Sequence, residues 1–171
     1  PKISGKKVDS FSVSDQKRIE DYILRYPAGK ATGVLICLYT GMRIGELMAL
    51  RWSDVDMENA VISVNGTCRD GFKNGRLIKI IDTPKTESSK REIPIPVQLL
   101  PYLIELKSKA IGEYVISNHG NIISVRGYQK SFSLLLKRLD IDHKSFHSLR
   151  HTFATRALEC GMDVKTLADI L

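Results

Sequence analysis

The sequence predicts a mainly α-helical domain with a small three-stranded antiparallel sheet, an α+β fold. Apolar residues recur at helical spacing in the first 50 residues and again after residue 97. Between these two parts, short runs rich in valine and isoleucine alternate with turn residues, a pattern typical of strands. A chain of 171 residues fits one domain, and this length can bury roughly 70% of the unfolded surface.

The helices are predicted from apolar stripes and from the residues that end them. The first begins at Ser14 or Asp15, because a serine side chain caps free amides and an acid suits the helix dipole. It ends at Tyr26, before Pro27. Gly161 is predicted to stop a later helix. The other predicted helices span residues 31–39, 97–106, 128–139, 146–158 and 164–171, with a shorter one from residue 42 or 43.

The strands are predicted from three β-branched runs at residues 61–64, 77–81 and 93–95. Turn signals separate the runs, among them Asp70-Gly71 and Asn74-Gly75. We therefore expect these three runs to pair as one antiparallel sheet.

The net charge of +7 favours a polyanionic partner, because neutralising phosphates releases counterions. Charge that only keeps the protein dissolved is the alternative. No run of about 18 apolar residues occurs, so no membrane span is predicted. The three cysteines are scattered and odd in number, which predicts reduced thiols in a cytoplasmic protein.

The segment HSLRHT, residues 147–152, is the most informative for chemistry. Residues three apart share a helix face, so His147 and Arg150 project together. A guanidinium clamps two phosphate oxygens and an imidazole donates or shuttles a proton, so the pair suits a phosphate. Taken alone, the segment could also be a solvated polar helix face.

Arg43 lies in TGMRIGEL, after a glycine turn at a predicted helix start, where free amides and the helix dipole favour anions. Glu46 follows one turn later and can pair with Arg43, which would hold the arginine in one rotamer. Taken alone, an ordinary surface pair worth about 0.3 kcal/mol is the simpler interpretation.

Lys85 stands in TPKT, at the start of a predicted turn before the basic segment KREIP. Lysine is a mobile proton donor with a tunable pKa, so it can reach a neighbouring groove and protonate a leaving oxygen. The alternative is that Lys85 only solubilises or protects a strand edge.

Together these motifs resemble the catalytic domain of the tyrosine recombinase (phage integrase) family. The family patterns TGxRxGEL, a lysine in a TKT-like context followed by basic residues and V/IPI, and HxLRHT correspond to residues 40–47, 83–96 and 147–152. They occur in the family's order and at its usual separations, and the resemblance spans about residues 15–171. It implies the tyrosine recombinase catalytic-domain fold, which is helical with a small sheet.

The resemblance also implies a role for each matching residue. Arg43 and Arg150 would stabilise the charge that develops on a scissile phosphate. His147 would act as a general acid/base and phosphate ligand, Lys85 as the general acid for the leaving 5′-hydroxyl, and Glu46 as support for the pocket. A tyrosine of the family attacks the phosphate and forms a 3′-phosphotyrosyl link. No cofactor and no metal are implied.

The parent enzyme implied by the resemblance is a site-specific recombinase or integrase of a mobile element. Its implied partners are double-stranded DNA and other recombinase subunits in a synaptic complex. All six tyrosines precede Arg150, so we expect the nucleophile to be absent from this chain. Residues 1–12 are then a linker from a missing core-binding domain, and residues 13–171 are a partial catalytic domain that cannot cleave DNA alone.

Five further residues are predicted on weaker grounds to contact DNA. Arginine and glutamine can read base edges, whereas exposed arginine and lysine more often meet phosphate or solvent. The five are Lys90, Arg91, Arg126, Gln129 and Lys130.

Two other functions stay open at this point. One is a non-catalytic DNA-binding relative; the other is a type IB topoisomerase, although TGMRIGEL and HSLRHT favour the integrase branch. His143, His147 and His151 recur at intervals of four. Without an HExxH glutamate or a cysteine cluster, this spacing does not predict a zinc site.

Overall fold

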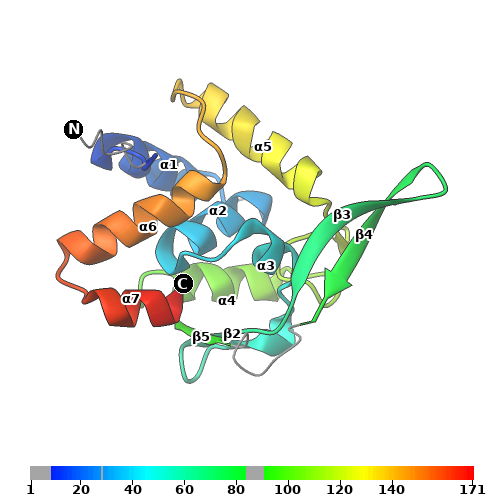
Figure 1. Ribbon diagram of the computed structural model, residues 1–171, viewed down its shortest axis with the longest axis horizontal. Coiled ribbons are helices and arrows are strands. Elements are labelled where there is room, and N and C mark those ends of the chain that lie inside the picture. Colours follow the sequence, from blue (N-terminus) through cyan, green and yellow to red (C-terminus); the bar gives the residue numbers. More distant parts are fainter. Residues whose placement is uncertain (1–8, 28, 84–90) are drawn as a thin grey trace, which may run out of the picture.

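The computed structural model describes residues 9–27, 29–83 and 91–171. Its central helix is α2 (Gly29–Thr40), which is buried along most of its length. The other helices surround α2 (Figure 1) and are α1 (Val13–Arg25), α3 (Ile44–Ala49), α4 (Leu100–Ser108), α5 (Val125–Arg138), α6 (His147–Glu159) and α7 (Val164–Ile170), with a 3-10 turn, η1 (Trp52–Asp54). The mainly α-helical class is thereby confirmed.

The predicted helix boundaries are confirmed to within a few residues. The first helix is capped by Ser12 rather than Ser14, since the Asp15 amide donates to Ser12 Oγ at 3.0 Å. Gly161 has a φ of +90°, a conformation that glycine adopts readily, and it follows α6 as predicted. No helix in the described ranges is both long and apolar enough to cross a membrane.

A three-stranded antiparallel sheet is present, but its membership differs from the prediction. The order is β1 (Val55–Asp56), β2 (Val61–Val64), β5 (Arg91–Pro94). The expectation that residues 77–81 join this sheet is wrong. They lie in β4 (Arg76–Asp82), which among the described residues pairs with β3 (Thr67–Lys73) alone. A last short pair, β6 (Ser117–Asn118) and β7 (Asn121–Ile122), precedes α5.

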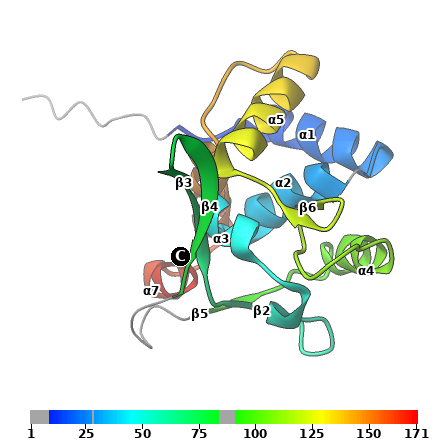
Figure 2. The same ribbon diagram turned by 90° about the vertical axis from the view of Figure 1, so that its right-hand side faces the viewer.

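The β3–β4 hairpin turns at Asn74 and Gly75, whose φ values are +51° and +71°. This two-residue turn suits the right-handed twist of antiparallel strands. Asp70 and Gly71, predicted to be a turn, instead lie inside β3. The hairpin projects from the helical body, with its base near α3 and β3 running past the start of α5 (Figures 1 and 2).

Residues 9–12, predicted to be linker, pack against α6 instead. Phe11 is buried, its amide donates to Thr152 Oγ1 at 2.8 Å, and its carbonyl accepts from Arg156 at 3.0 Å. Asp9 accepts hydrogen bonds from Lys144 at 2.6 Å and from the Ser148 hydroxyl at 2.7 Å. By these contacts the domain includes residues 9–12, and the segment fixes one side of α6.

Aromatic rings join this segment to α5 and α6 in the core. Phe11 meets Phe132 edge to face with centroids 6.3 Å apart, and Phe132 meets Phe146 at 5.0 Å. Tyr128 packs on Phe146 at 5.5 Å, and its hydroxyl donates to the Lys30 carbonyl at the start of α2. Such pairs stabilise by about 1 kcal/mol beyond burial, so the two helices that carry half of the predicted site residues share one packed core.

Candidate active site

A glycine turn between α2 and α3 places the first arginine. Thr40 ends α2 by donating from its hydroxyl to the Ile36 carbonyl at 2.5 Å, and it accepts from the Met42 amide at 3.3 Å. Gly41 has a φ of +68°, and a Cβ there would lie 2.5 Å from Leu171 Cδ2 and 2.6 Å from Phe153 Cδ1. Both conformation and packing therefore require glycine at this position.

Arg43 is the N-cap residue of α3, and Glu46 holds it in place. The Arg43 amide donates to Glu46 Oε2 at 2.8 Å, and its guanidinium reaches Oε1 at 3.1 Å. The predicted pairing is confirmed. Gly45 allows α3 to lie against β3, because a Cβ would come within 2.5 Å of Thr67 Oγ1 and 2.8 Å of the Cys68 carbonyl. Half of the Arg43 side chain stays exposed.

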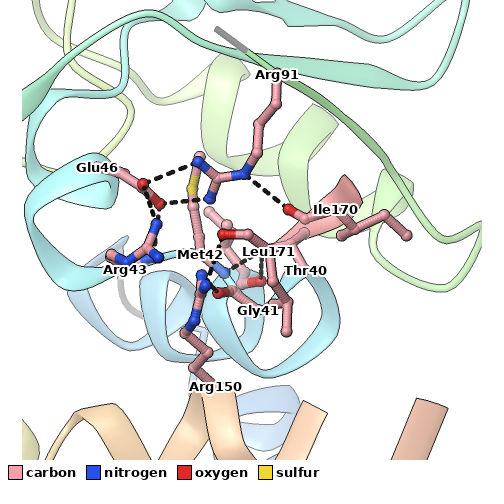
Figure 3. A network of polar contacts seen from close by, with 10 residues as sticks. Thr40, Gly41, Met42, Arg43, Glu46, Arg91, Arg150, Ile170 and Leu171 are labelled. Atoms are coloured by element: carbon pink, nitrogen blue, oxygen red, sulfur yellow. Dashed lines mark hydrogen bonds and ion pairs between the residues drawn. The ribbon is translucent and has the colours of Figure 1, made fainter. Parts of the chain in front are cut away.

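Glu46 also receives a second arginine, Arg91, from β5. The Arg91 guanidinium donates to both carboxylate oxygens, at 3.0 and 2.8 Å, and its Nε donates to the Ile170 carbonyl at 2.7 Å (Figure 3). Burial alone would raise the pKa of Glu46, but hydrogen bonds from Arg91 and Arg43 outweigh this effect and lower the pKa. Glu46 is therefore an ionised, buried counter-ion for two arginines.

The expectation that Arg91 contacts the DNA backbone does not fit this geometry. Its side chain is 16% exposed, and three of its donors are directed at Glu46 and Ile170. Arg91 directly follows Lys90 in a basic pair, so sequence position alone did not distinguish the buried arginine from a surface residue. Arg91 instead ties β5 to α3 and to the end of α7.

Arg150 reaches the same region from α6. Its guanidinium donates to the Gly41 carbonyl at 2.8 Å and to the Leu171 carbonyl at 2.6 Å (Figure 3). Burial, and then the positive charge of Arg43, lower the pKa of Arg150 to about 10. The guanidinium is still charged at neutral pH, and it lies close to another cation.

His147 lies on the same face of α6, as the i,i+3 spacing predicted. Partial burial, followed by the nearby charges of His151, Arg150 and Arg43, lowers the pKa of His147. Its ring meets the His151 ring at right angles, with centroids 4.5 Å apart. The imidazole is therefore neutral at neutral pH, so it can both donate and accept a proton.

These side chains line one surface pocket with a volume of about 320 Å³. Arg43 lines it from the N-cap of α3, His147 and Arg150 line it from α6, and Gln129 lines it from α5. Thr67 of β3 and Ser145 complete its polar lining. The pocket presents two guanidiniums and one imidazole to a ligand, and the pKa values of His147 and Arg150 are lowered first by burial and then by nearby positive charge.

The remaining predicted residues divide into two groups. Arg126, Gln129 and Lys130 are all exposed on α5, and the Arg126 guanidinium lies over the Phe72 ring at 5.7 Å. Lys85 and Lys90 fall between β4 and β5 in the sequence and lie outside the described residues. The roles expected for Lys85 and Lys90 therefore stay predictions.

Sequence reasoning missed the contributions of Thr67, Ser145 and Arg91. Thr67 has no motif of its own and reaches the pocket only because Gly45 lets α3 approach β3. Ser145 lies one residue before the N-cap of α6 and outside the HSLRHT motif, so the motif did not indicate it. The basic pair formed by Lys90 and Arg91 indicated that Arg91 has a role, but it did not indicate that Arg91 is buried.

No group of three histidine, cysteine or acidic side chains gathers in the described part of the chain. The pocket is lined by donors of positive or neutral character, whereas divalent cations are held by anionic or neutral acceptor ligands. Its chemistry suits an anion.

Comparison with known proteins agrees with this geometry. The chain matches the Phage integrase family over residues 11–171. It is 30% identical to a "Tyrosine recombinase XerC-like" protein of Caldanaerobacter subterraneus subsp. tengcongensis, over 96% of this chain and 47% of that protein. It is 33% identical to the "Integrase" of Staphylococcus phage L54a, over 80% of this chain and 42% of that protein. The chain thus spans less than half the length of these relatives.

Solved structures show the same fold. The Tn1549 transposon integrase, in complex with a circular intermediate DNA, superposes with a TM-score of 0.83 at 25% identity, covering 98% of this chain and 58% of that one. XerA recombinase superposes with a TM-score of 0.76 at 24% identity, covering all of this chain and 56% of that one. By its matched residues, its fold and its relatives, this chain belongs to the phage integrase family of tyrosine recombinases.

Proposed function

We propose that this chain is the phosphate-binding part of a catalytic domain that cleaves and rejoins DNA, in an enzyme that integrates or excises a mobile element. One observation carries the proposal. Two guanidiniums and an imidazole, from segments over 100 residues apart in the sequence, line one pocket, where burial and then nearby positive charge, including that of Arg43, lower the pKa of His147 and Arg150. A phosphodiester in this pocket would offset that positive charge, and more so as charge develops during the reaction.

The pocket residues divide the work of phosphoryl transfer. Arg43 and Arg150 donate to the non-bridging oxygens, and Glu46 keeps Arg43 oriented. A tyrosine oxygen attacks phosphorus and passes its proton to His147, the bond to the 5′ oxygen breaks, and Lys85 supplies a proton to that oxygen. His147 holds the phosphate and exchanges a proton with the reacting oxygens. Attack by a 5′-hydroxyl of another strand reverses these steps, so the phosphodiester bond energy is retained.

None of the chain's six tyrosines, all of which the structure describes, lines the pocket. Tyr128 is buried, with its hydroxyl bonded to the Lys30 carbonyl, and burial holds its pKa well above the ordinary value. The nucleophile is therefore proposed to come from outside these 171 residues, which alone would not cleave DNA.

The proposed partners are double-stranded DNA and further recombinase subunits. A lambda integrase structure is of a tetramer bound to a Holliday junction, and the Tn1549 integrase structures hold DNA. In this chain the exposed face of α5 with Arg126, Gln129 and Lys130 lies next to the pocket, which supports DNA contact at that helix. The free cysteines support a reducing compartment, the cytoplasm.

The test is covalent attachment to DNA. The product of the whole gene, the same product with Arg150→Ala, and residues 1–171 alone are incubated with nicked DNA that carries the element's end. We expect an adduct that survives denaturation only with the unaltered whole product. Binding by all three proteins without any adduct would replace this proposal with a non-catalytic DNA-binding protein.

A further inference from the structure

The start of α5 is capped by a residue from a different part of the fold. Asp70, inside β3, accepts from the Val125 amide at 3.0 Å with one carboxylate oxygen and from the Arg126 amide at 2.9 Å with the other. Ser124 Oγ accepts from the next free amide, Gly127, at 3.1 Å. The first amides of a helix have no partner within the helix. Here the Asp70 carboxylate, 55 residues before Val125 in the sequence, accepts hydrogen bonds from the first two amides of α5.

Two neighbours of Asp70 on the same face of the hairpin contact the segment around the start of α5 as well. Lys79, the cross-strand partner of Asp70, donates from Nζ to the Ile122 carbonyl at 2.5 Å. Phe72, two residues beyond Asp70, lies under the Arg126 guanidinium. The hairpin therefore holds residues 122–126 by a carboxylate, an ammonium and a ring. Figures 1 and 2 show β3 and the start of α5 lying together.

The base of the same hairpin borders the phosphate pocket. Thr67, the first residue of β3, lines that pocket and lies against Gly45 of the helix that Arg43 begins. Asp70 follows three residues later along the strand. One rigid strand thus connects the arginine side of the pocket to the start of the helix that carries Arg126, Gln129 and Lys130.

We propose that Asp70 is a positioning residue that fixes α5, and the exposed polar face it carries, relative to the phosphate pocket. The β3–β4 hairpin then sets the distance between the exposed face of α5 and the phosphate pocket. This inference rests on the proposed function for its consequence in DNA recognition, whereas the cap itself is a property of the fold.

The variant that tests the role is Asp70→Asn in the whole gene product. Asparagine keeps the shape and one acceptor oxygen, but it directs an amide donor at the second backbone N–H. The matched control is Asp82→Asn, which removes an equal charge from the same hairpin. Asp82 pairs with Arg69 at 2.7 Å, and the structure records no contact between its side chain and α5. Ser124→Ala removes the local cap and leaves the hairpin contact intact.

Two readouts are measured for each variant. One is the exchange rate of the Val125 and Arg126 amide hydrogens; the other is the ratio of affinities for element-end DNA and scrambled DNA at one salt concentration. For Asp70→Asn we expect exchange to accelerate and the affinity ratio to fall, each roughly tenfold, in line with the loss of a cap. Asp82→Asn should leave both within about twofold, and Ser124→Ala should lower the ratio less than Asp70→Asn does.

The outcomes separate the two proposals. A wild-type protein that does not prefer element-end DNA contradicts the proposed function, and the recognition role of Asp70 fails with it. A wild-type protein that does prefer this DNA, combined with equal affinity ratios for Asp70→Asn and Asp82→Asn, overturns the positioning role alone. Unchanged amide exchange in Asp70→Asn would show that the cap does not form.

Discussion

Two faces border the pocket and differ in how their side chains are held. On the α3 and α6 side, Arg43, Arg91 and Arg150 are bonded to the buried Glu46 or to backbone carbonyls. On the α5 side, Arg126 lies over an aromatic ring and Gln129 and Lys130 are exposed. The side chains of the first face are held by the protein itself, whereas Gln129 and Lys130 of the second face are exposed on a helix whose start Asp70 caps.

The difference explains why the two faces have different sequence signals. A guanidinium that must meet a phosphate within tenths of an ångström needs its own partners, which fix residue types at several positions. TGMRIGEL contains such a set: a turn glycine, the arginine, a glycine for close approach and the buried glutamate. A face that recognises DNA needs only exposed polar residues that match one DNA sequence, so no fixed sequence motif marks it.

The largest expected effect on stability comes from breaking the buried network. Glu46→Ala leaves the largely buried Arg91 guanidinium without its carboxylate partner. We expect the free energy of unfolding to fall by about 3 kcal/mol. Denaturant unfolding of the wild-type and variant chains measures it.

The matched control is Glu113→Ala, whose partner Arg51 lies 3.6 Å away with both side chains about half exposed. That change should alter the unfolding free energy by less than about 0.5 kcal/mol. Equal losses in the two variants would mean that the fixed face is no more constrained than an ordinary surface.

A second effect separates packing from backbone conformation. Gly41 and Gly75 have similar φ values, +68° and +71°, but a Cβ meets Leu171 and Phe153 at Gly41 and nothing within 4 Å at Gly75. We expect Gly75→Ala to cost about 1 kcal/mol from strain and Gly41→Ala about 2 kcal/mol more from overpacking. Thermal unfolding of both variants checks the difference; matching losses would refute the packing argument.

A smaller effect is expected from pH. The pKa of Glu46 in the folded chain lies below its ordinary value of 4.5, because the arginine hydrogen bonds outweigh burial. The carboxylate therefore stabilises the fold fully above that value, and the stabilisation is lost as the pH falls through the folded pKa. We expect Glu46→Gln to flatten the stability profile below pH 4.5, where the wild type loses this stabilisation. A profile as steep as that of the wild type would assign the acid sensitivity to other carboxylates.

The smallest effects on stability are expected on α5. Lys130→Ala should change unfolding free energy by less than about 0.5 kcal/mol. If Lys130 meets a phosphate, the same change should lower the slope of binding affinity against salt concentration by about one. A large stability loss would show that the α5 face is not free, which would remove the contrast between the two faces.

The sequence predicted the helices and most of the pocket, because their signals are local. Gly41, Arg43 and Glu46 lie within six residues, and His147 and Arg150 lie one helical turn apart. Strand β3, which the sequence did not predict, had the opposite character. Asp70-Gly71 has the composition of a turn, yet Asp70 lies inside β3, where its carboxylate caps a helix that starts 55 residues later. No local pattern records that contact.

The buried position of Arg91 was hidden for the same reason. Its partner Glu46 is 45 residues away, and only the pairing of β5 with β2 and the approach of α3 bring them together. A basic pair in the sequence is compatible with either an exposed or a buried arginine, and only tertiary contacts determine which of the two occurs.

The most direct test of the account separates chemistry from recognition in the whole gene product. The rate of covalent adduct formation at saturating protein and the dissociation constant for element-end DNA are measured for Arg150→Ala and Arg126→Ala. We predict that Arg150→Ala slows the saturated rate by about 100-fold or more with a small change in affinity, whereas Arg126→Ala mainly weakens binding. An Arg150→Ala protein that binds more weakly but reacts at the wild-type rate when saturated would contradict the assignment of this pocket to the scissile phosphate.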